Sequence, residues 1–224
     1  MKNRSQNSEA RIQKAANAPE KKSAPLLILI SAPSGGGKTT LCQQLLKARP
    51  GMTRAITCTT RPPRKGERDG VDYYFFSAAE FLKRLQAGNF LEHATVYGSS
   101  YGILKSELLG KLRSGRDVLL NVDVQGAATI RAQAESEPEL HRALVTIFLT
   151  PPSVEVLAQR LRRRGADAAA VIQKRLAVAR QEISQWKNFD YLVISGSKQE
   201  DLRRTLAIVE SEKMRSARSA APEF

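Results

Sequence analysis

Glycine, lysine and threonine follow one another in the stretch SAPSGGGKTT, residues 31–40, directly after the apolar run PLLILI. A glycine-rich turn directs several backbone N–H groups at one point, and a helix that begins there adds the positive end of its dipole. The glycines at 35–37 let the backbone approach a phosphate chain without interference from Cβ atoms. Lys38 would bring an ammonium group to the β- and γ-phosphates, and the Thr39 hydroxyl would bind Mg²⁺. The stretch therefore predicts a nucleoside triphosphate site.

The predicted triphosphate-binding residues form one continuous segment. The strict motif begins with glycine at the position that Ala32 occupies, and we expect Thr40 to serve mainly the start of the helix. An ordinary glycine-rich helix entry with a surface lysine is the alternative, but a buried strand before the turn and a helix after it favour phosphate binding. The predicted residues are Ala32, Pro33, Ser34, Gly35, Gly36, Gly37, Lys38, Thr39 and Thr40.

A second basic stretch, TTRPPRKGERDGVDYYFF at 59–76, predicts a site for a phosphate monoester. Arg61 and Arg64 lie three positions apart across two prolines, which stiffen the loop. Each guanidinium fork matches two phosphate oxygens, so a rigid pair grips a monoester well. Tyr73 and Tyr101 could each add a phenolic O–H. A solvated basic turn is the alternative, but the stretch shares a domain with the triphosphate loop.

A cluster of arginines near the end of the chain could cover the triphosphate. QRLRRRG contains Arg160 and the arginines at 162–164, and Arg175 follows inside the next predicted helix. A helix–turn–helix with this spacing can fold over a nucleotide. Fixed cations there would stabilise the negative charge of the phosphates, and closure would keep water out.

The elements that position these residues alternate between apolar strands and amphipathic helices. Strands are predicted in LLILIS, RDVLLNVDVQG, LVTIFLT and DYLVIS, and helices lie between and after them. This alternation predicts an α/β fold with a mainly parallel sheet. The β-rich stretch at about 55–96 interrupts this alternation of strands and helices and predicts an inserted lobe. Inside it, Ser77 and Glu80 form a capping box for a helix that Gly88 can close.

The remaining boundaries follow from composition. Residues 1–24 lack apolar periodicity and predict a disordered basic extension, 25–212 predict the folded domain, and 213–224 predict a flexible tail. Inside the domain we expect a core made of 25–54, 97–152 and 182–212, the lobe, and a lid at about 153–181.

The net charge is +14, of which residues 25–212 carry +8, so the basic excess lies mostly in the folded part. Such a surface suits nucleic acid or a small polyanion such as a nucleotide, and charge alone does not distinguish them. The apolar fraction of 42% suffices for an ordinary core, while no apolar run approaches the ~20 residues that span a bilayer. With no signal-peptide pattern and only Cys42 and Cys58, we expect a cytoplasmic protein with reduced thiols.

Six motifs in the same order resemble those of guanylate kinases, the enzymes that transfer phosphate from ATP to GMP. They are SAPSGGGKTTL, TCTTRPPRKGERDGVDYYF, FLEHATVYGSSYG, LLNVDVQGA, FLTPPSVEVLAQRLRRRG and IQKRLAVARQE, and the resemblance covers about 25–212. It implies a P-loop nucleoside monophosphate kinase fold with a GMP-binding lobe and a helical lid, Mg²⁺ with ATP as the donor, and GMP or dGMP as the acceptor.

The resemblance also implies residue roles. Glu92 and Asp123 would face the guanine ring, whose N1–H and N2–H₂ a carboxylate can accept together, whereas adenine offers no equivalent pair. The implied GMP-binding residues are Thr57, Arg61, Arg64, Tyr73, Glu92, Tyr101 and Asp123. The implied catalytic residues are Lys38, Arg160, Arg164 and Arg175, with Thr39 at the metal. From the residues alone, Glu92 could equally be a salt-bridged surface acid and Asp123 a ligand of Mg²⁺.

Three positions depart from the family pattern. Asn121 replaces a usual acid, Ile103 stands where a Ser or Thr often contacts phosphate, and Ser195 occupies an Asn position near adenine. An inactive guanylate-kinase-like binding module is the main alternative, but such modules lose the phosphate loop and lid arginines that this chain keeps. A kinase for another monophosphate fits Glu92 and Asp123 poorly. No nucleic-acid recognition motif is present, no membrane partner is expected, and the oligomeric state, a homo-oligomer included, stays open.

Overall fold

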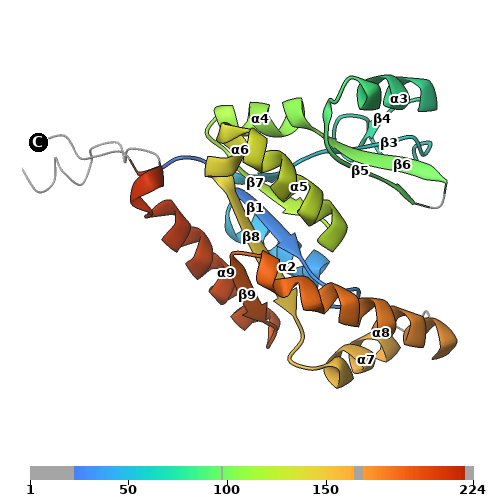
Figure 1. The fold of residues 1–224 in the computed structure, drawn as a ribbon, viewed down its shortest axis with the longest axis vertical. Helices are drawn as coiled ribbons and strands as arrows, with labels where there is room; N and C mark the ends of the chain where they lie inside the picture. Colours follow the sequence, from blue (N-terminus) through green and yellow to red (C-terminus); the bar gives the residue numbers. More distant parts are fainter. Residues whose placement is uncertain (1–22, 97, 164–168, 220–224) are drawn as a thin grey trace, which may run out of the picture.

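The computed structural model describes residues 23–96, 98–163 and 169–219. These residues form two sheets with helices around them, which confirms the predicted α/β class (Figure 1). The larger sheet has the strand order β2-β7-β1-β8-β9, and all its neighbouring strands pair in parallel. Its strands are β1 (Leu27–Ser31), β2 (Met52–Arg54), β7 (Asp117–Asn121), β8 (Leu144–Thr150) and β9 (Tyr191–Ile194).

Apolar side chains alternate between the two faces of β1, and each face supports its own helices. Leu27 and Leu29 belong to the apolar cluster beneath α4, α5 and α6, whereas Ile28 and Ile30 belong to the cluster beneath α2 and α9. A strand buried on both faces needs apolar residues at every position, which explains the uninterrupted run that precedes the glycine turn. The helices are α2 (Lys38–Ala48), α4 (Lys105–Arg113), α5 (Val124–Ser136), α6 (Pro138–Ala143) and α9 (Lys198–Lys213).

The inserted lobe is a second sheet of order β4-β3-β6-β5 that packs beside α3 (Figure 1). Its predicted end near 96 falls inside the hairpin of β5 and β6, and the sheet continues to Leu104. The Ser77 side chain accepts a hydrogen bond from the backbone N–H of Glu80, and Gly88 has a φ of 67°, as predicted for the two ends of α3. The elements are β3 (Thr57–Thr59), β4 (Tyr74–Phe75), α3 (Ala78–Gln86), β5 (Phe90–Val96) and β6 (Ser99–Leu104).

A helical pair follows β8 and forms a separate small unit with its own apolar cluster. It consists of α7 (Val154–Arg163) and α8 (Ala169–Ser184), which lie together at one end of the molecule (Figure 1). Leu157, Leu161 and Leu176 are buried between them. Two short 3₁₀ helices complete the described chain, η1 (Gln185–Asn188) and η2 (Ser216–Arg218).

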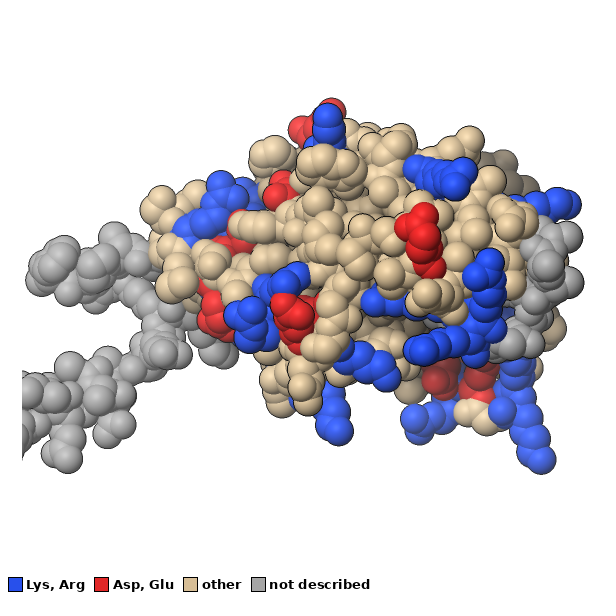
Figure 2. All heavy atoms as spheres, turned by 90° about the horizontal axis from the view of Figure 1, so that it is seen from below, with Lys and Arg blue, Asp and Glu red and all other residues tan. Residues whose placement is uncertain are grey.

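Within the described ranges, no helix has the length and apolarity required to cross a bilayer. Cys42 and Cys58 are both buried and free, which agrees with the prediction of two reduced thiols. On the face seen in Figure 2, lysine and arginine side chains are spread more widely than acidic ones.

Candidate nucleotide site

The candidate site begins at the carboxyl end of β1, where the chain turns into α2. Gly35 and Gly37 have φ values of 86° and 103°, a left-handed conformation that residues with a Cβ rarely adopt, and Gly37 is the N-cap of α2. A pocket of about 300 Å³ opens on this turn. It is lined by eight of the nine predicted triphosphate residues, with Asp123 and Glu182. Thr40, the ninth, lines a neighbouring pocket.

Lys38 reaches from the first turn of α2 to the end of β7. Its Nζ donates a hydrogen bond to the backbone oxygen of Val122 at 2.9 Å. Burial lowers the pKa of Lys38, and the nearby carboxylates of Asp123 and Glu182 oppose this shift. The ammonium group is therefore fixed beside the glycine turn, where an anionic ligand would further favour its charged form.

Glu182, from α8, is an acidic residue that the sequence did not single out. The backbone N–H of Ser34 donates a hydrogen bond to Glu182 Oε2 at 3.3 Å. Burial raises the pKa of Glu182, while the Ser34 N–H and Lys38 act in the opposite direction. A single acid inside a long helix gives no sequence signal, because only the fold of α8 against the glycine turn brings it into the pocket.

Arg61, Tyr73 and Tyr101 meet on the lobe, as the sequence predicted for a phosphate site. The guanidinium of Arg61 lies 5.5 Å from the centre of the Tyr73 ring, and the two tyrosine rings are 6.4 Å apart, edge to face. The pKa of Arg61 is raised, first by a hydrogen bond to Glu67 and also by one to Tyr101. The Arg64 side chain is exposed on the same loop.

Glu67, another residue not singled out, organises this loop. Arg61 Nη2 donates to both of its carboxylate oxygens, at 2.8 and 2.9 Å, and the backbone N–H of Arg64 donates to Glu67 Oε2 at 2.7 Å. One acid therefore holds the two predicted phosphate-binding arginines in a fixed relation. An acid six residues after Arg61 gives only a weak sequence signal, because the turn of the loop is what brings the two side chains together.

Three strands of the lobe bring Thr57 and Glu92 to the same face. Thr57 pairs with Ile103, and Ile103 pairs with Glu92, so the three side chains form one row across β3, β6 and β5. Ile103 is 5% exposed and belongs to the main apolar cluster, so it offers packing at the position where the family often has a hydroxyl. Glu92, at the end of the row, is half-buried.

Asp123 lies opposite this row, at the N-terminus of α5. Its side chain caps the helix by accepting a hydrogen bond from the Gly126 N–H at 2.8 Å. A Cβ on Gly126 would lie 3.3 Å from Glu92 Cγ, so glycine permits the close approach of β5 to α5. Burial, and then the charge of Asp123, raise the pKa of Glu92 to about 7. Asn121, two residues earlier, is exposed at the end of β7.

The lid helices bring two of the predicted arginines into the described structure. Arg160, on α7, donates from Nη1 to the backbone oxygen of Gly36 at 3.3 Å and to Ser195 Oγ at 3.1 Å. Arg175 is half-buried on α8. Arg164 lies outside the described residues. Arg160 therefore contacts the glycine turn directly, and Ser195, one of the three departures, is its partner.

A magnesium ion would find suitable oxygen ligands beside the glycine turn. The Thr39 hydroxyl and the Asp123 carboxylate line the same pocket. Among the described residues there is no cluster of three or more histidine, cysteine or acidic side chains that could hold a metal by itself. Mg²⁺ commonly uses one or two protein oxygens together with substrate phosphates and water, so this sparse set fits it.

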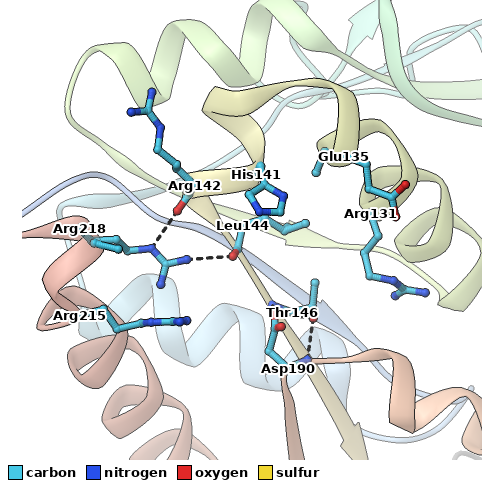
Figure 3. A pocket seen from close by; sticks show the side chains of 11 residues that line it. Arg131, Glu135, His141, Arg142, Leu144, Thr146, Asp190, Arg215 and Arg218 are labelled. Atoms are coloured by element: carbon cyan, nitrogen blue, oxygen red, sulfur yellow. Dashed lines mark hydrogen bonds between the residues drawn. The ribbon is translucent and has the colours of Figure 1, made fainter.

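A second hollow, of about 420 Å³, lies at the opposite end of β8 and contains none of these residues (Figure 3). Arg218 there donates to the backbone oxygens of Arg142 and Leu144, at 2.9 and 3.1 Å, and pairs with Glu212. Its charge and donors are thus used to attach η2 to the start of β8. We assign this hollow to the packing of the C-terminal segment, because parallel α/β sheets bind ligands at the other end of the strands.

Comparison with known proteins matches residues 24–212 to the family described as Guanylate kinase. The guanylate kinase of Hahella chejuensis (strain KCTC 2396) is 44% identical over 189 residues, which cover 84% of this chain and 88% of that protein. The guanylate kinase of Coxiella burnetii (strain RSA 493 / Nine Mile phase I) is 43% identical over 188 residues, with the same two coverages.

The crystal structure of guanylate kinase from Anaplasma phagocytophilum resembles the whole arrangement. It superposes with a TM-score of 0.65 at 32% identity, and covers 88% of this chain and 90% of that one. The family match, the identities and the shared fold confirm the resemblance that the six motifs indicated. The chain belongs to the guanylate kinase family and is a nucleoside monophosphate kinase.

Proposed function

We propose that the gathered residues transfer the γ-phosphoryl group of ATP to GMP, giving ADP and GDP. The observation that carries this assignment is the position of Asp123. It lines the pocket on the glycine turn and also acts electrostatically on Glu92 of the lobe. A donor triphosphate on the turn and an acceptor nucleotide with its base beside Glu92 would therefore lie on two sides of Asp123, and direct transfer between two nucleotides needs such neighbouring sites.

On the acceptor side, Arg61, Arg64, Tyr73 and Tyr101 would hold the phosphate of GMP. The carboxylate of Glu92 would accept N1–H and N2–H₂ of guanine, while Thr57 and Asp123 lie near the same edge. Adenine presents no such pair of donors and would leave a partly buried acid without a partner. No residue in this set needs the ribose 2′-hydroxyl, so we expect dGMP to be accepted as well.

On the donor side, the N–H groups of the glycine turn and Lys38 would bind the β- and γ-phosphates, with Arg160, Arg164 and Arg175 around the transferring group. The reaction needs no protein nucleophile, since the phosphate of GMP attacks directly and is largely dianionic near pH 7. Bound Mg²⁺, held through Thr39, would neutralise charge on the donor phosphates. The remaining contribution of the chain is fixed positive charge and exclusion of water.

The competing function is that of an inactive protein-binding module with this fold. The contacts of Lys38 with Val122 and of Arg160 with Gly36 argue against this function. Both cations are held at the glycine turn, and a docking surface requires neither. The cytoplasmic location and the absence of a nucleic-acid partner stay predictions from the sequence, and the oligomeric state stays open.

A coupled assay of ADP formation with GMP, dGMP, AMP and UMP tests the proposal. We expect kcat/KM for GMP to exceed that for AMP by at least about 10⁴-fold, because the discrimination rests on hydrogen-bonded polar groups. The variant Glu92→Ala should raise KM for GMP and narrow this ratio, while Glu80→Ala, which removes a half-exposed acid of α3 that pairs with Arg84, should not. No turnover with any monophosphate would favour the binding module, and faster turnover of AMP or UMP would reassign the acceptor.

A further inference from the structure

Both terminal nitrogens of the Arg160 guanidinium donate hydrogen bonds to one hydroxyl group, that of Ser195. Both Nη1 and Nη2 donate to Ser195 Oγ, each at 3.1 Å, and Nη1 also donates to the Gly36 backbone oxygen. Ser195 is 5% exposed and follows the last residue of β9. An arginine fork usually meets two oxygens of one carboxylate or phosphate, so a lone serine oxygen is an unusual partner that itself needs support.

That support comes from Asp201, in the first turn of α9. Ser195 Oγ donates to Asp201 Oδ2 at 2.8 Å, and the backbone N–H of Gly196 donates to Asp201 Oδ1 at 2.8 Å. Asp201 is 7% exposed, and Thr205 Oγ1 donates to its backbone oxygen at 2.8 Å. Both carboxylate oxygens thus have donors, and the carboxylate lies in the first turn of α9, at the positive end of the helix dipole.

The direction of these hydrogen bonds is fixed by chemistry. A serine hydroxyl has one proton and two lone pairs, and an arginine has donors only. Because the proton of Ser195 is given to Asp201, both lone pairs face Arg160. The chain of bonds from Arg160 through Ser195 to Asp201 therefore connects a cation to a buried anion through one oriented hydroxyl group.

We infer that Asp201 and Ser195 are positioning residues, which hold Arg160 over the glycine turn for phosphoryl transfer. This inference rests on the proposed function. The three residues line one pocket of about 590 Å³ together with Gly35 and Gly37, so the bonded chain borders the donor side of the site. A cation that stabilises a transition state must already be in place, and displacement by about 1 Å can cost about 10²-fold in rate.

Asp201→Asn is the sharpest variant because it keeps the shape and removes the charge. The new NH₂ group must face either the Ser195 hydroxyl or the Gly196 N–H. Beside the hydroxyl, it would donate to the serine oxygen and compete with Arg160; beside Gly196, it would place two donors against each other. Ser195→Ala removes the bridge itself and covers the case in which Asp201→Asn does not fold. Glu200→Gln is the matched control, since Glu200 is the adjacent acid on α9 and pairs instead with Arg204.

Each variant should be made with Arg160 and with Arg160→Ala, and the kcat, both KM values and the affinity for Mg·ADP measured. We expect Asp201→Asn and Ser195→Ala to lower kcat about tenfold when Arg160 is present and by less than about twofold when it is absent, with KM for GMP unchanged. Glu200→Gln should match the wild type. Equal losses in both backgrounds, or none, would overturn the inference.

The wild-type assay separates failure of this inference from failure of the proposed function. If the wild type does not phosphorylate GMP, the proposed function fails, and the calorimetric affinity for Mg·ADP still tests the bonded chain. Asp201→Asn and Ser195→Ala should then weaken Mg·ADP binding only when Arg160 is present. Weakening that does not depend on Arg160 would show that Asp201 serves the fold alone.

Discussion

Glu92 on β5 and Asp123 at the start of α5 are electrostatically linked, although they belong to the lobe and to the main layer respectively. After burial, the charge of Asp123 is the second cause that raises the pKa of Glu92, to about 7. Without ligand, Glu92 is therefore protonated in about half of the molecules near neutral pH. If Glu92 reads guanine as proposed, the donors of the guanine edge would favour its ionised form, and base recognition would be coupled to proton release.

The first prediction concerns pH and GMP affinity. Below pH 7 a proton must leave Glu92 before its carboxylate can accept from guanine, so we expect the Kd for GMP to rise as the pH falls, by up to about tenfold per unit. Binding near pH 6.5 should release protons, which calorimetry in buffers of different ionisation enthalpy measures. Glu92→Gln should lose this contribution and keep only the titration of the GMP phosphate. An identical pH profile for the two proteins would remove Glu92 from the base site.

The same pKa predicts a pH-dependent stability difference. An acid whose pKa is raised by folding binds a proton more tightly in the native state, so its ionisation destabilises the fold as the pH rises from about 4.5 to 7. In the absence of nucleotide, the Tm of Glu92→Gln minus that of the wild type should therefore be larger at about pH 8 than at about pH 5. Thermal unfolding at both pH values provides the measurement, and a gain at the lower pH would contradict the sign.

Removal of the Lys38 amine should abolish turnover and leave the fold intact. Lys38→Met keeps most of the aliphatic chain and loses one hydrogen bond, to the Val122 oxygen. We expect kcat to fall by at least about 10²-fold, as for other losses of a fixed cation or donor near developing charge. Circular dichroism and Tm should stay close to those of the wild type. Near wild-type phosphorylation of GMP would show that the glycine turn does not hold the donor.

Arg61→Ala should weaken the binding of GMP more than the binding of ATP. Arg61 lies on the lobe with Tyr73 and Tyr101, away from the glycine turn, so we expect KM for GMP to rise by about 10²-fold while KM for ATP changes by less than about threefold. Glu67→Gln should produce an intermediate rise, because it weakens the partner that fixes Arg61.

Lys65→Ala is the control for Arg61→Ala. It removes a positive charge from the same loop, but its side chain is exposed. A similar effect of Lys65→Ala and Arg61→Ala would mean that only the general charge of the loop matters. Equal weakening of ATP and GMP by Arg61→Ala would contradict its placement at the acceptor phosphate.

Gly35→Ala should destabilise the packing of the lid against the glycine turn. The new Cβ would lie 2.9 Å from Leu161 Cδ2 and 3.1 Å from Leu157 Cδ1, at a φ of 86°. Gly88→Ala has a comparable φ of 67° but no atom within 4 Å, so it isolates the backbone cost, about 1 kcal/mol. We expect Gly35→Ala to lose about 1–3 kcal/mol more than Gly88→Ala in denaturant unfolding. Equal losses would show that Leu157 and Leu161 move aside freely.

The sequence by itself determined the class of fold and predicted the donor site. A run such as Leu26–Ile30 can be buried on both faces only as a central strand, and a glycine turn followed by Lys38 and Thr39 has few uses other than phosphate binding. The same local chemistry determined the ends of α3, because Ser77 and Glu80 are close in the chain and cap the helix without help from distant residues.

Tertiary structure alone decided how distant residues combine. The row of Thr57, Ile103 and Glu92 depends on strand register, and the end of the lobe depends on a hairpin that returns as far as Leu104. Glu182, Ser195 and Asp201 line the pockets at the glycine turn only because α8, β9 and α9 close around it. Such contacts link residues up to 148 positions apart, and no local pattern encodes them, since each results from how whole elements pack.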